Sequence, residues 1–249
     1  MIWRSIGASA IGTYHVANEK QLEDALCWRI VDGTLICLVS DGAGSASEAT
    51  FAAQYCVNSG VTLIAEHLLE NNQVDEAFIY SLVEHLRDRL ITEAQENDKT
   101  PDDYLSTILG CILSSDKSIF FQIGDGAIVR QTGEGIYSAV WWPDNGEYQN
   151  HTHFLIEEEA ESFLKIQILD TPTQSVALFT DGLQLLTLNY ENQQVHAPFF
   201  DDMFKFAAMA DSDEKQTILN QKLAEYLNSE RINARTDDDK TLFLATLNS

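Results

Sequence analysis

The chain has 249 residues, of which 45% are hydrophobic, and its 39 acidic and 15 basic residues give a formal net charge of −24. The apolar fraction suffices for a sizeable core and excludes a chain that is disordered throughout. The charge argues against nucleic acids and membranes as partners, because binding to either relies on Lys and Arg to neutralise phosphates. A divalent cation or a basic protein suits this chain better, although most of its carboxylates need no role beyond solubility.

The cysteines and the N-terminal segment predict a cytoplasmic protein. Cys27, Cys37, Cys56 and Cys111 have apolar neighbours and no C-x-x-C spacing, so we expect buried free thiols in a reducing compartment. The first residues lack the basic and long apolar regions of a signal peptide. No apolar run approaches the roughly 18 residues that a membrane span requires.

Helical and strand-like patterns follow one another along a single domain, which we expect to cover residues 1–249. Apolar residues recur at helical spacing over about 49–68 and 78–94, and a third helix is expected over about 213–228. The apolar runs of strand length are 25–31, 34–40, 106–113, 118–123, 127–130, 135–140, 153–156, 175–180 and 241–247. This order lacks a regular βαβ alternation, and it predicts an α+β fold: a sandwich of two mainly antiparallel sheets flanked by helices.

Aspartates mark the ends of several predicted strands. Asp41, Asp125 and Asp181 each follow a strand and precede a glycine, whereas Asp237, Asp238 and Asp239 come directly before the last strand. The start of an antiparallel strand lies beside the ends of its neighbours, so we expect these carboxylates at one end of the sandwich. The pair Glu23 and Asp24 precedes another strand.

Carboxylates that cluster repel one another unless a cation neutralises them, and Mg²⁺ and similar hard ions prefer oxygen ligands. Two bridged metal ions are a common device for hydrolysing phosphate esters. A single Asp-Gly after a strand is more often just a turn, and on the residues alone a metal site and a set of turns remain about equally plausible. The repetition of the motif favours the site.

The motifs together resemble the metal-dependent Ser/Thr protein phosphatases (protein phosphatase 2C-like), most closely a bacterial subgroup. The motifs that carry this resemblance are Glu23-Asp24-Ala25, Ser40-Asp41-Gly42-Ala43-Gly44, Ser106-Thr107, Gly124-Asp125-Gly126, Thr180-Asp181-Gly182 and Asp238-Asp239-Lys240-Thr241. They occur in the family's order over nearly the whole chain. The resemblance implies a phosphorylated protein as substrate and a Ser/Thr kinase as a functional counterpart in signalling.

The resemblance also implies a site with two Mg²⁺ or Mn²⁺ ions and the role of each ligand. The implied ligands are Glu23, Asp24, Asp41, the Gly42 carbonyl, Asp181 and Asp238, and Asp125 would belong to a weak third site. Asp24, Asp41, Asp181 and Asp238 would be the catalytic set. A metal-activated water would hydrolyse phosphoserine or phosphothreonine without a phosphoenzyme.

Three positions depart from the family pattern. Ala43 replaces a His found in some members, Glu19 replaces a phosphate-binding Arg, and Leu185 replaces an acid that supports the third metal. Lys20, beside Glu19, could bind the substrate phosphate as a point charge. The missing Arg and His keep open an alternative: a weak or inactive relative that binds phosphoproteins or partners as a regulatory module. A phosphatase acting on a small metabolite is a further alternative.

Two more features carry weaker hypotheses. Residues of about 186–213 are expected to form a flap-like insertion near the site, and its aromatic stretch could select the substrate or simply pack. His151 and His153 have the alternate spacing of two ligands on one strand face, but no third ligand is near, which makes a Zn²⁺ site the weaker interpretation. His15 could support the site or be a hydrogen-bonded structural residue.

Overall fold

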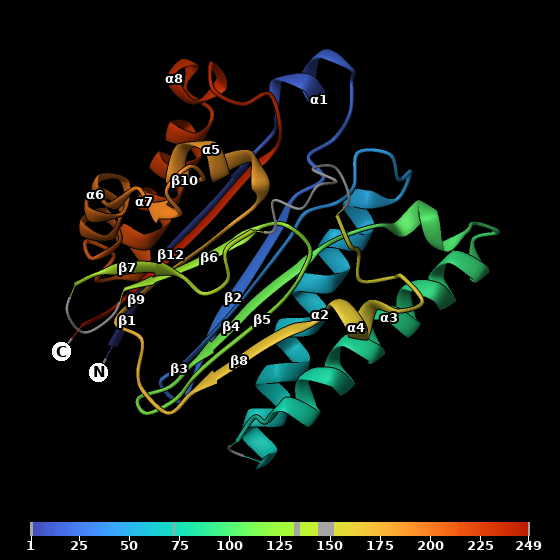
Figure 1. The fold of residues 1–249 in the computed structure, drawn as a ribbon, viewed down its shortest axis with the longest axis horizontal. Helices are drawn as coiled ribbons and strands as arrows, with labels where there is room; N and C mark the ends of the chain where they lie inside the picture. The colour runs from blue at the N-terminus through green and yellow to red at the C-terminus, as the bar shows by residue number, and fades with distance from the viewer. Residues whose placement is uncertain (1, 72, 132–134, 144–151, 249) are drawn as a thin grey trace.

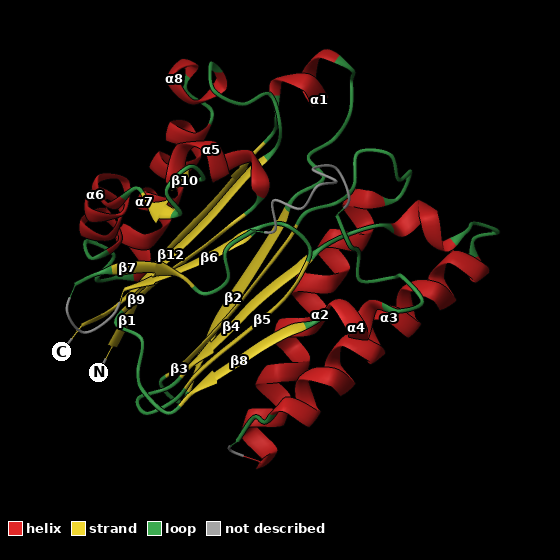
Figure 2. Cartoon of the chain, viewed as in Figure 1, coloured by secondary structure: helices red, strands yellow, loops and turns green. Residues whose placement is uncertain are grey.

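The two β-sheets pack face to face, and helices cover the outer face of each sheet (Figures 1 and 2). The structure, a computed structural model, describes residues 2–71, 73–131, 135–143 and 152–248. Within these residues no helix is long and apolar enough to cross a bilayer. The expected α-β-β-α sandwich is confirmed.

The first sheet has the strand order β2-β3-β4-β5-β8 and is antiparallel throughout. Its strands are β2 (Ala25–Val31), β3 (Thr34–Ser40), β4 (Ile108–Leu113), β5 (Ser118–Ile123) and β8 (Lys165–Leu169). Its outer face is covered by α2 (Ala49–Asn71), α3 (Glu76–Glu96) and α4 (Ala160–Phe163), with a 3-10 helix, η1 (Pro101–Tyr104), after α3.

The second sheet has the order β1-β12-β9-β6-β7. Its strands are β1 (Ile2–Ala10), β12 (Lys240–Asn248), β9 (Ser175–Phe179), β6 (Ala127–Gln131) and β7 (Tyr137–Ala139). The helices on its outer side are α5 (Gln184–Thr187), α6 (Ala197–Ala207), α7 (Asp213–Leu227) and α8 (Glu230–Asn233). The remaining elements are α1 (Thr13–Ala17), η2 (Asp181–Leu183) and the hairpin of β10 (Leu188–Asn189) and β11 (Gln194–Val195).

Apolar side chains form three clusters, one between each pair of layers. Leu35, Cys37 and Val39 of β3 face the second sheet, whereas Ile36 and Leu38 face the helices of the first. Both faces of β3 are therefore buried, which explains why its sequence is continuously apolar rather than alternating. All four cysteines are free thiols, as expected; Cys37, Cys56 and Cys111 are buried, whereas Cys27 is only half-buried.

The structure confirms most expected elements and corrects three. The predicted strand at 153–156 is a turn, because Leu155 and Ile156 pack into the cluster beneath α2 and α3 rather than pairing with a strand. Strands β1 and β8 were not expected; each lies at the edge of a sheet, where polar residues interrupt the apolar pattern. In the region expected to be a flap, Phe200 and Phe204 of α6 are buried against the second sheet.

Candidate active site

A cavity of about 340 Å³ lies at the end of the sandwich where the expected aspartates meet. Asp41, Asp125, Asp181 and Asp238 all line it, although they come from four separate segments of the chain. Asp41 follows a strand of the first sheet and Asp181 a strand of the second, while Asp125 lies in the connection between the sheets. The predicted convergence of the strand-end carboxylates is therefore observed.

Asp41 is held where the pairing of β3 with β4 ends. Its backbone N–H donates to Thr107 Oγ1 at 2.9 Å, and its carbonyl accepts from the Thr107 N–H at 2.8 Å. At Gly42 the chain passes very close to other backbone: an added Cβ would lie 2.8 Å from the carbonyl oxygens of Glu23 and Ala49. Any side chain at this position would force the backbone next to Asp41 to shift.

Asp181 and Asp238 are brought together by the pairing of β9 with β12. Gly182 follows Asp181, and a Cβ at this glycine would lie 2.0 Å from the carbonyl oxygen of Asp239. This glycine therefore allows the two acidic segments to approach within backbone contact. The Asp238 side chain is exposed to the cavity, and its Oδ1 accepts a hydrogen bond from the Asp239 N–H at 2.8 Å.

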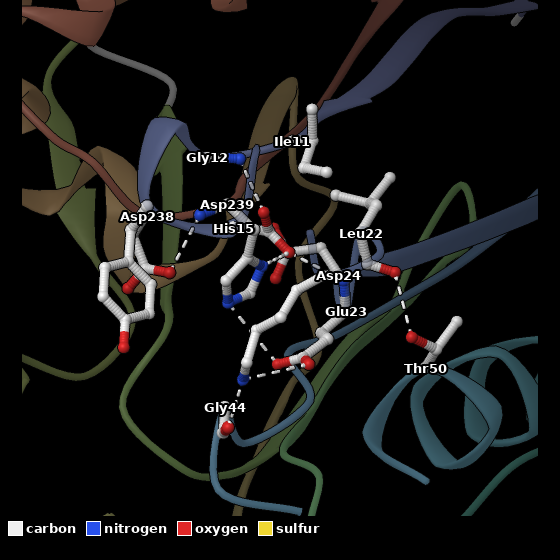
Figure 3. A network of polar contacts seen from close by, with 12 residues as sticks. Ile11, Gly12, His15, Leu22, Glu23, Asp24, Gly44, Thr50, Asp238 and Asp239 are labelled. Atoms are coloured by element: carbon white, nitrogen blue, oxygen red, sulfur yellow. Dashed lines mark hydrogen bonds and ion pairs between the residues drawn. The ribbon is translucent and has the colours of Figure 1, made fainter. Parts of the chain in front are cut away.

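Asp239 is buried and points away from the cavity, toward the chain around Gly12 and Glu23 (Figure 3). Its Oδ1 accepts from the Gly12 N–H at 2.6 Å and its Oδ2 from the Glu23 N–H at 2.7 Å. The same Oδ2 lies 3.0 Å from Nδ1 of the buried His15, whose side chain lines the cavity. Asp239 thus ties β12 to the segments on both sides of α1.

Glu23 and Asp24 lie beside Asp239 and do not line the cavity. Glu23 Oε1 lies 3.5 Å from Lys20 Nζ, and its Oε2 lies 3.6 Å from His15 Nε2 (Figure 3). Asp24 is buried, and its Oδ2 accepts from Thr180 Oγ1 at 2.8 Å. Asp24 Oδ1 and Glu23 Oε2 are buried without a hydrogen-bond partner in the described part of the chain.

Lys20, predicted to bind the substrate phosphate, is turned toward Glu23. Its ammonium group also donates to the Gly44 carbonyl, and Lys20 is not among the residues that line the cavity. Glu19, at the position of the missing Arg, is exposed and has a positive φ of 56°. The described residues of the lining thus contain no Lys or Arg.

Asp125 is supported from two sides. Its carboxylate accepts a hydrogen bond from Thr152, and its carbonyl accepts one from the Gln184 amide. Tyr190 in turn donates to the Gln184 side-chain oxygen. His153 follows Thr152, but its Nδ1 lies 3.1 Å from Glu157 Oε2 and its ring stacks on Phe163. His151 lies outside the described residues.

Burial and mutual repulsion raise the pKa values of Asp24, Asp41 and Asp181. Burial raises the pKa of Asp41 well above its usual value, and the charges of Asp24 and Asp181 add to this effect. Burial also raises the pKa of Asp181, to about 7, with further contributions from Asp125 and Asp238. The pKa of Asp24 is raised well above its usual value, chiefly by burial. A cation in the cavity would reverse this effect, because it favours the charged form.

Some residues of the site were not selected from the sequence. Asp239 belongs to the Asp triplet, but the family resemblance gave a role to Asp238 only, and the strand pattern does not show that the Asp239 side chain is buried. Thr107 and Thr180 hold the backbone of Asp41 and the side chain of Asp24. Tyr14 and Asp237 lie on the cavity wall. Hydroxyl residues at strand ends are common in any fold, so their roles could only be read from the structure.

Solved structures share the fold of this chain. The chain is similar to a bacterial serine phosphatase with a TM-score of 0.66 and 14% identity over 98% of both chains. It is also similar to the serine/threonine phosphatase Stp1 from Staphylococcus aureus, with a TM-score of 0.64 and 11% identity over 100% of this chain and 96% of that one. At these identities the likeness establishes the fold.

The family follows from the sequence matches. The family model described as protein phosphatase 2C matches residues 11–228. The chain is also 35% identical over 251 aligned residues to serine/threonine-protein phosphatase 3 from Escherichia coli strain K12, covering 98% of each. The chain belongs to the protein phosphatase 2C family, as its motifs predicted.

Proposed function

We propose that this protein is a protein phosphatase that hydrolyses phosphoserine and phosphothreonine esters with the help of Mg²⁺ or Mn²⁺. The observation that carries the proposal is the cavity itself. Asp41, Asp125, Asp181 and Asp238 face it, and its described lining holds no Lys or Arg. A phosphate ester is an anion, so it can enter such a cavity only when cations neutralise the carboxylates.

We propose that these residues hold two divalent ions. Oxygen-rich sites suit Mg²⁺ and Mn²⁺, and the buried oxygens Glu23 Oε2, Asp24 Oδ1 and Asp181 Oδ1 have no hydrogen-bond partner in the described residues. We assign the ions to the side chains of Glu23, Asp24, Asp41, Asp181 and Asp238 and the Gly42 carbonyl. Asp125 would belong to a weak third site, because Leu185 supplies no acid there.

The protein's own contribution is to bring the backbones of these carboxylates to one end of the sandwich. In the described residues no three His, Cys, Asp or Glu side chains already have the arrangement of a metal site. Cation binding therefore requires the carboxylate side chains to turn toward a common point. Asp239 and Thr107 meanwhile hold the backbone of Glu23 and of Asp41 in place. The bound ions would supply positive charge and lower the pKa of a water molecule.

The partners and location follow from the family and the composition. We propose a phosphorylated protein as substrate, a Ser/Thr kinase acting on the same protein, and a signalling role in a bacterial cytoplasm. The four free cysteines suit a reducing compartment. The acidic surface suits neither nucleic acids nor anionic membranes, because it offers little positive charge to their phosphates.

The first experiment measures hydrolysis of p-nitrophenyl phosphate and a phosphothreonine peptide with Mg²⁺, with Mn²⁺ and with EDTA. We expect activity that requires metal and is abolished in Asp238→Asn. Asp170→Asn is the matched control, because Asp170 is an exposed aspartate after β8, at the other end of the first sheet. A folded protein without activity under any condition would contradict the proposal and favour the regulatory module. Faster hydrolysis of phosphorylated metabolites than of phosphopeptides would favour a small-molecule phosphatase.

A further inference from the structure

A second and larger cavity, a groove of about 870 Å³, lies between α5, α6, α7 and α8 on the outer side of the second sheet. Leu185, Phe199, Met203 and Tyr226 supply apolar surface to this groove, and Arg231 and Arg235 supply charge. No step of the proposed hydrolysis uses these residues. The groove therefore needs an explanation of its own.

The groove and the acidic cavity are lined by segments that are close in the sequence and joined by hydrogen bonds. Leu185 follows Asp181 by four residues, and Arg235 precedes the cavity residue Asp237 by two. Tyr190 lines the groove, and its hydroxyl is linked through Gln184 to the Asp125 carbonyl. These links make the groove a candidate site for the part of a peptide next to a phosphorylated residue in the cavity.

The two arginines are available to a ligand. Both are exposed, and neither guanidinium has an ion pair or a hydrogen bond to another described residue. Asp202 also lines the groove, but its Oδ1 lies 3.7 Å from Lys205 Nζ, which offsets its negative charge. The groove therefore has a positive side, in a chain whose formal net charge is −24.

The apolar part of the groove is open as well. The Leu185 side chain is 77% exposed on α5, beside the acidic cavity. Phe199, Met203 and Tyr226 are partly buried and offer one face each. An apolar side chain of a ligand would gain by covering this surface, at roughly 25 cal/mol per Å² of area removed from water.

We propose that this groove binds the substrate segment next to the phosphorylated residue, and that it selects a segment with an apolar side chain and acidic residues. The inference rests on the proposed phosphatase function and names its substrate class. The net charge alone would favour a basic segment. At physiological salt, however, charges are screened beyond about 8 Å. The arginines of the groove therefore determine which charge the bound segment should carry.

The test compares two phosphothreonine peptides in the presence of Mn²⁺, one with leucine and glutamates around the phosphothreonine and one with leucine and lysines. The variant is Arg231→Glu/Arg235→Glu. Arg29→Glu is the control, since Arg29 is exposed in β2 beside a cavity near the chain termini, away from the acidic end. Hydrolysis of p-nitrophenyl phosphate, which is too small to reach the groove, reports the state of the acidic cavity in each protein.

We expect wild type to prefer the acidic peptide, and the double variant to lose about tenfold in kcat/KM for it relative to p-nitrophenyl phosphate, equivalent to about 1.4 kcal/mol. Arg29→Glu should lose nothing, and added salt should reduce the preference of wild type. Equal losses for both peptides, or a wild-type preference for the lysine peptide, would overturn the inference.

A binding measurement separates this inference from the proposed function. Fluorescence anisotropy of the labelled acidic peptide should show weaker binding to the double variant than to wild type, even if the protein has no catalytic activity. Equal binding to both proteins would refute the groove assignment while leaving the phosphatase proposal to its own experiment.

Discussion

The carboxylates at the acidic end of the sandwich form two adjacent groups with opposite surroundings. The cavity group, Asp41, Asp125, Asp181 and Asp238, lines the open space. The support group, Glu23, Asp24 and Asp239, is buried behind it, at 7%, 4% and 3% exposure. Asp238 and Asp239 are neighbours in the chain, yet they belong to different groups. Asp239 has protein partners on both carboxylate oxygens and holds the fold. Glu23 and Asp24 each keep one buried oxygen without a hydrogen-bond partner among the described residues, and the cavity group faces open space, so these carboxylates are able to bind a cation.

Among the variants of the two groups, we expect the largest loss of activity when Asp181 of the cavity group is replaced. We expect Asp181→Asn to lower metal-dependent hydrolysis of p-nitrophenyl phosphate by about 1000-fold, the upper range for a charged or polar group that faces a reacting centre. The fold should persist, as measured by circular dichroism. Activity within a few-fold of wild type would show that the cavity group does not bind the metal.

Asp239→Asn tests the support group. The substitution removes a buried charge that accepts hydrogen bonds from Gly12 and Glu23 and faces His15. We expect the free energy of unfolding to fall by about 3 kcal/mol, as when one partner of a buried polar network is lost. Urea unfolding measures this, with Asp238→Asn as the control. If both variants lose the same stability, the distinction between the two groups fails.

The pH dependence of the metal-free protein sharpens the comparison. The pKa of Asp181 is about 7 in the folded protein against an ordinary value of 3.8. A raised carboxyl pKa means that the folded state binds the proton more tightly, so this contribution to stability is full at low pH and is lost as pH rises from about 4 to 7.

Between pH 5 and 7, wild type should therefore lose about 2 kcal/mol relative to Asp181→Asn. Thermal unfolding in EDTA measures the difference. Mg²⁺ or Mn²⁺ should remove it by stabilising wild type. If wild type instead gains stability relative to the variant over this range, the pKa of Asp181 is not raised in the folded protein.

The smallest effect is expected at Lys20, whose contacts are to Glu23 and Gly44. Its side chain is 30% exposed, so water screens the pair and Lys20→Met should cost less than about 1 kcal/mol of stability. The KM for p-nitrophenyl phosphate should change less than twofold. A tenfold rise in KM would instead support the sequence-based prediction that Lys20 binds the substrate phosphate.

The sequence predicted the layers and the meeting point of the aspartates, because antiparallel strand ends adjoin whatever the details of packing. The strand pattern alone could not separate Asp238 from Asp239, because two adjacent aspartates look alike until the path of the backbone is known; only the family resemblance pointed to Asp238. The turn at 153–156 was wrongly predicted as a strand because Leu155 and Ile156 are apolar. They are apolar because they pack in the cluster beneath the helices, which the sequence pattern cannot distinguish from a strand. The groove was not foreseen, since its residues come from α5 through α8 and meet only in the folded protein.

The cavity also has a consequence for biosynthesis. Asp41 and Asp238 stand far apart in the chain, and β12 inserts between β1 and β9, the strand that leads to Asp181. The acidic cavity cannot be complete until β12, which ends at Asn248, has been made and paired. Such long-range pairing is slow to form. A nascent chain that already holds most of its strands would therefore still lack a finished site, which delays any catalysis until this part of the chain has left the ribosome and folded.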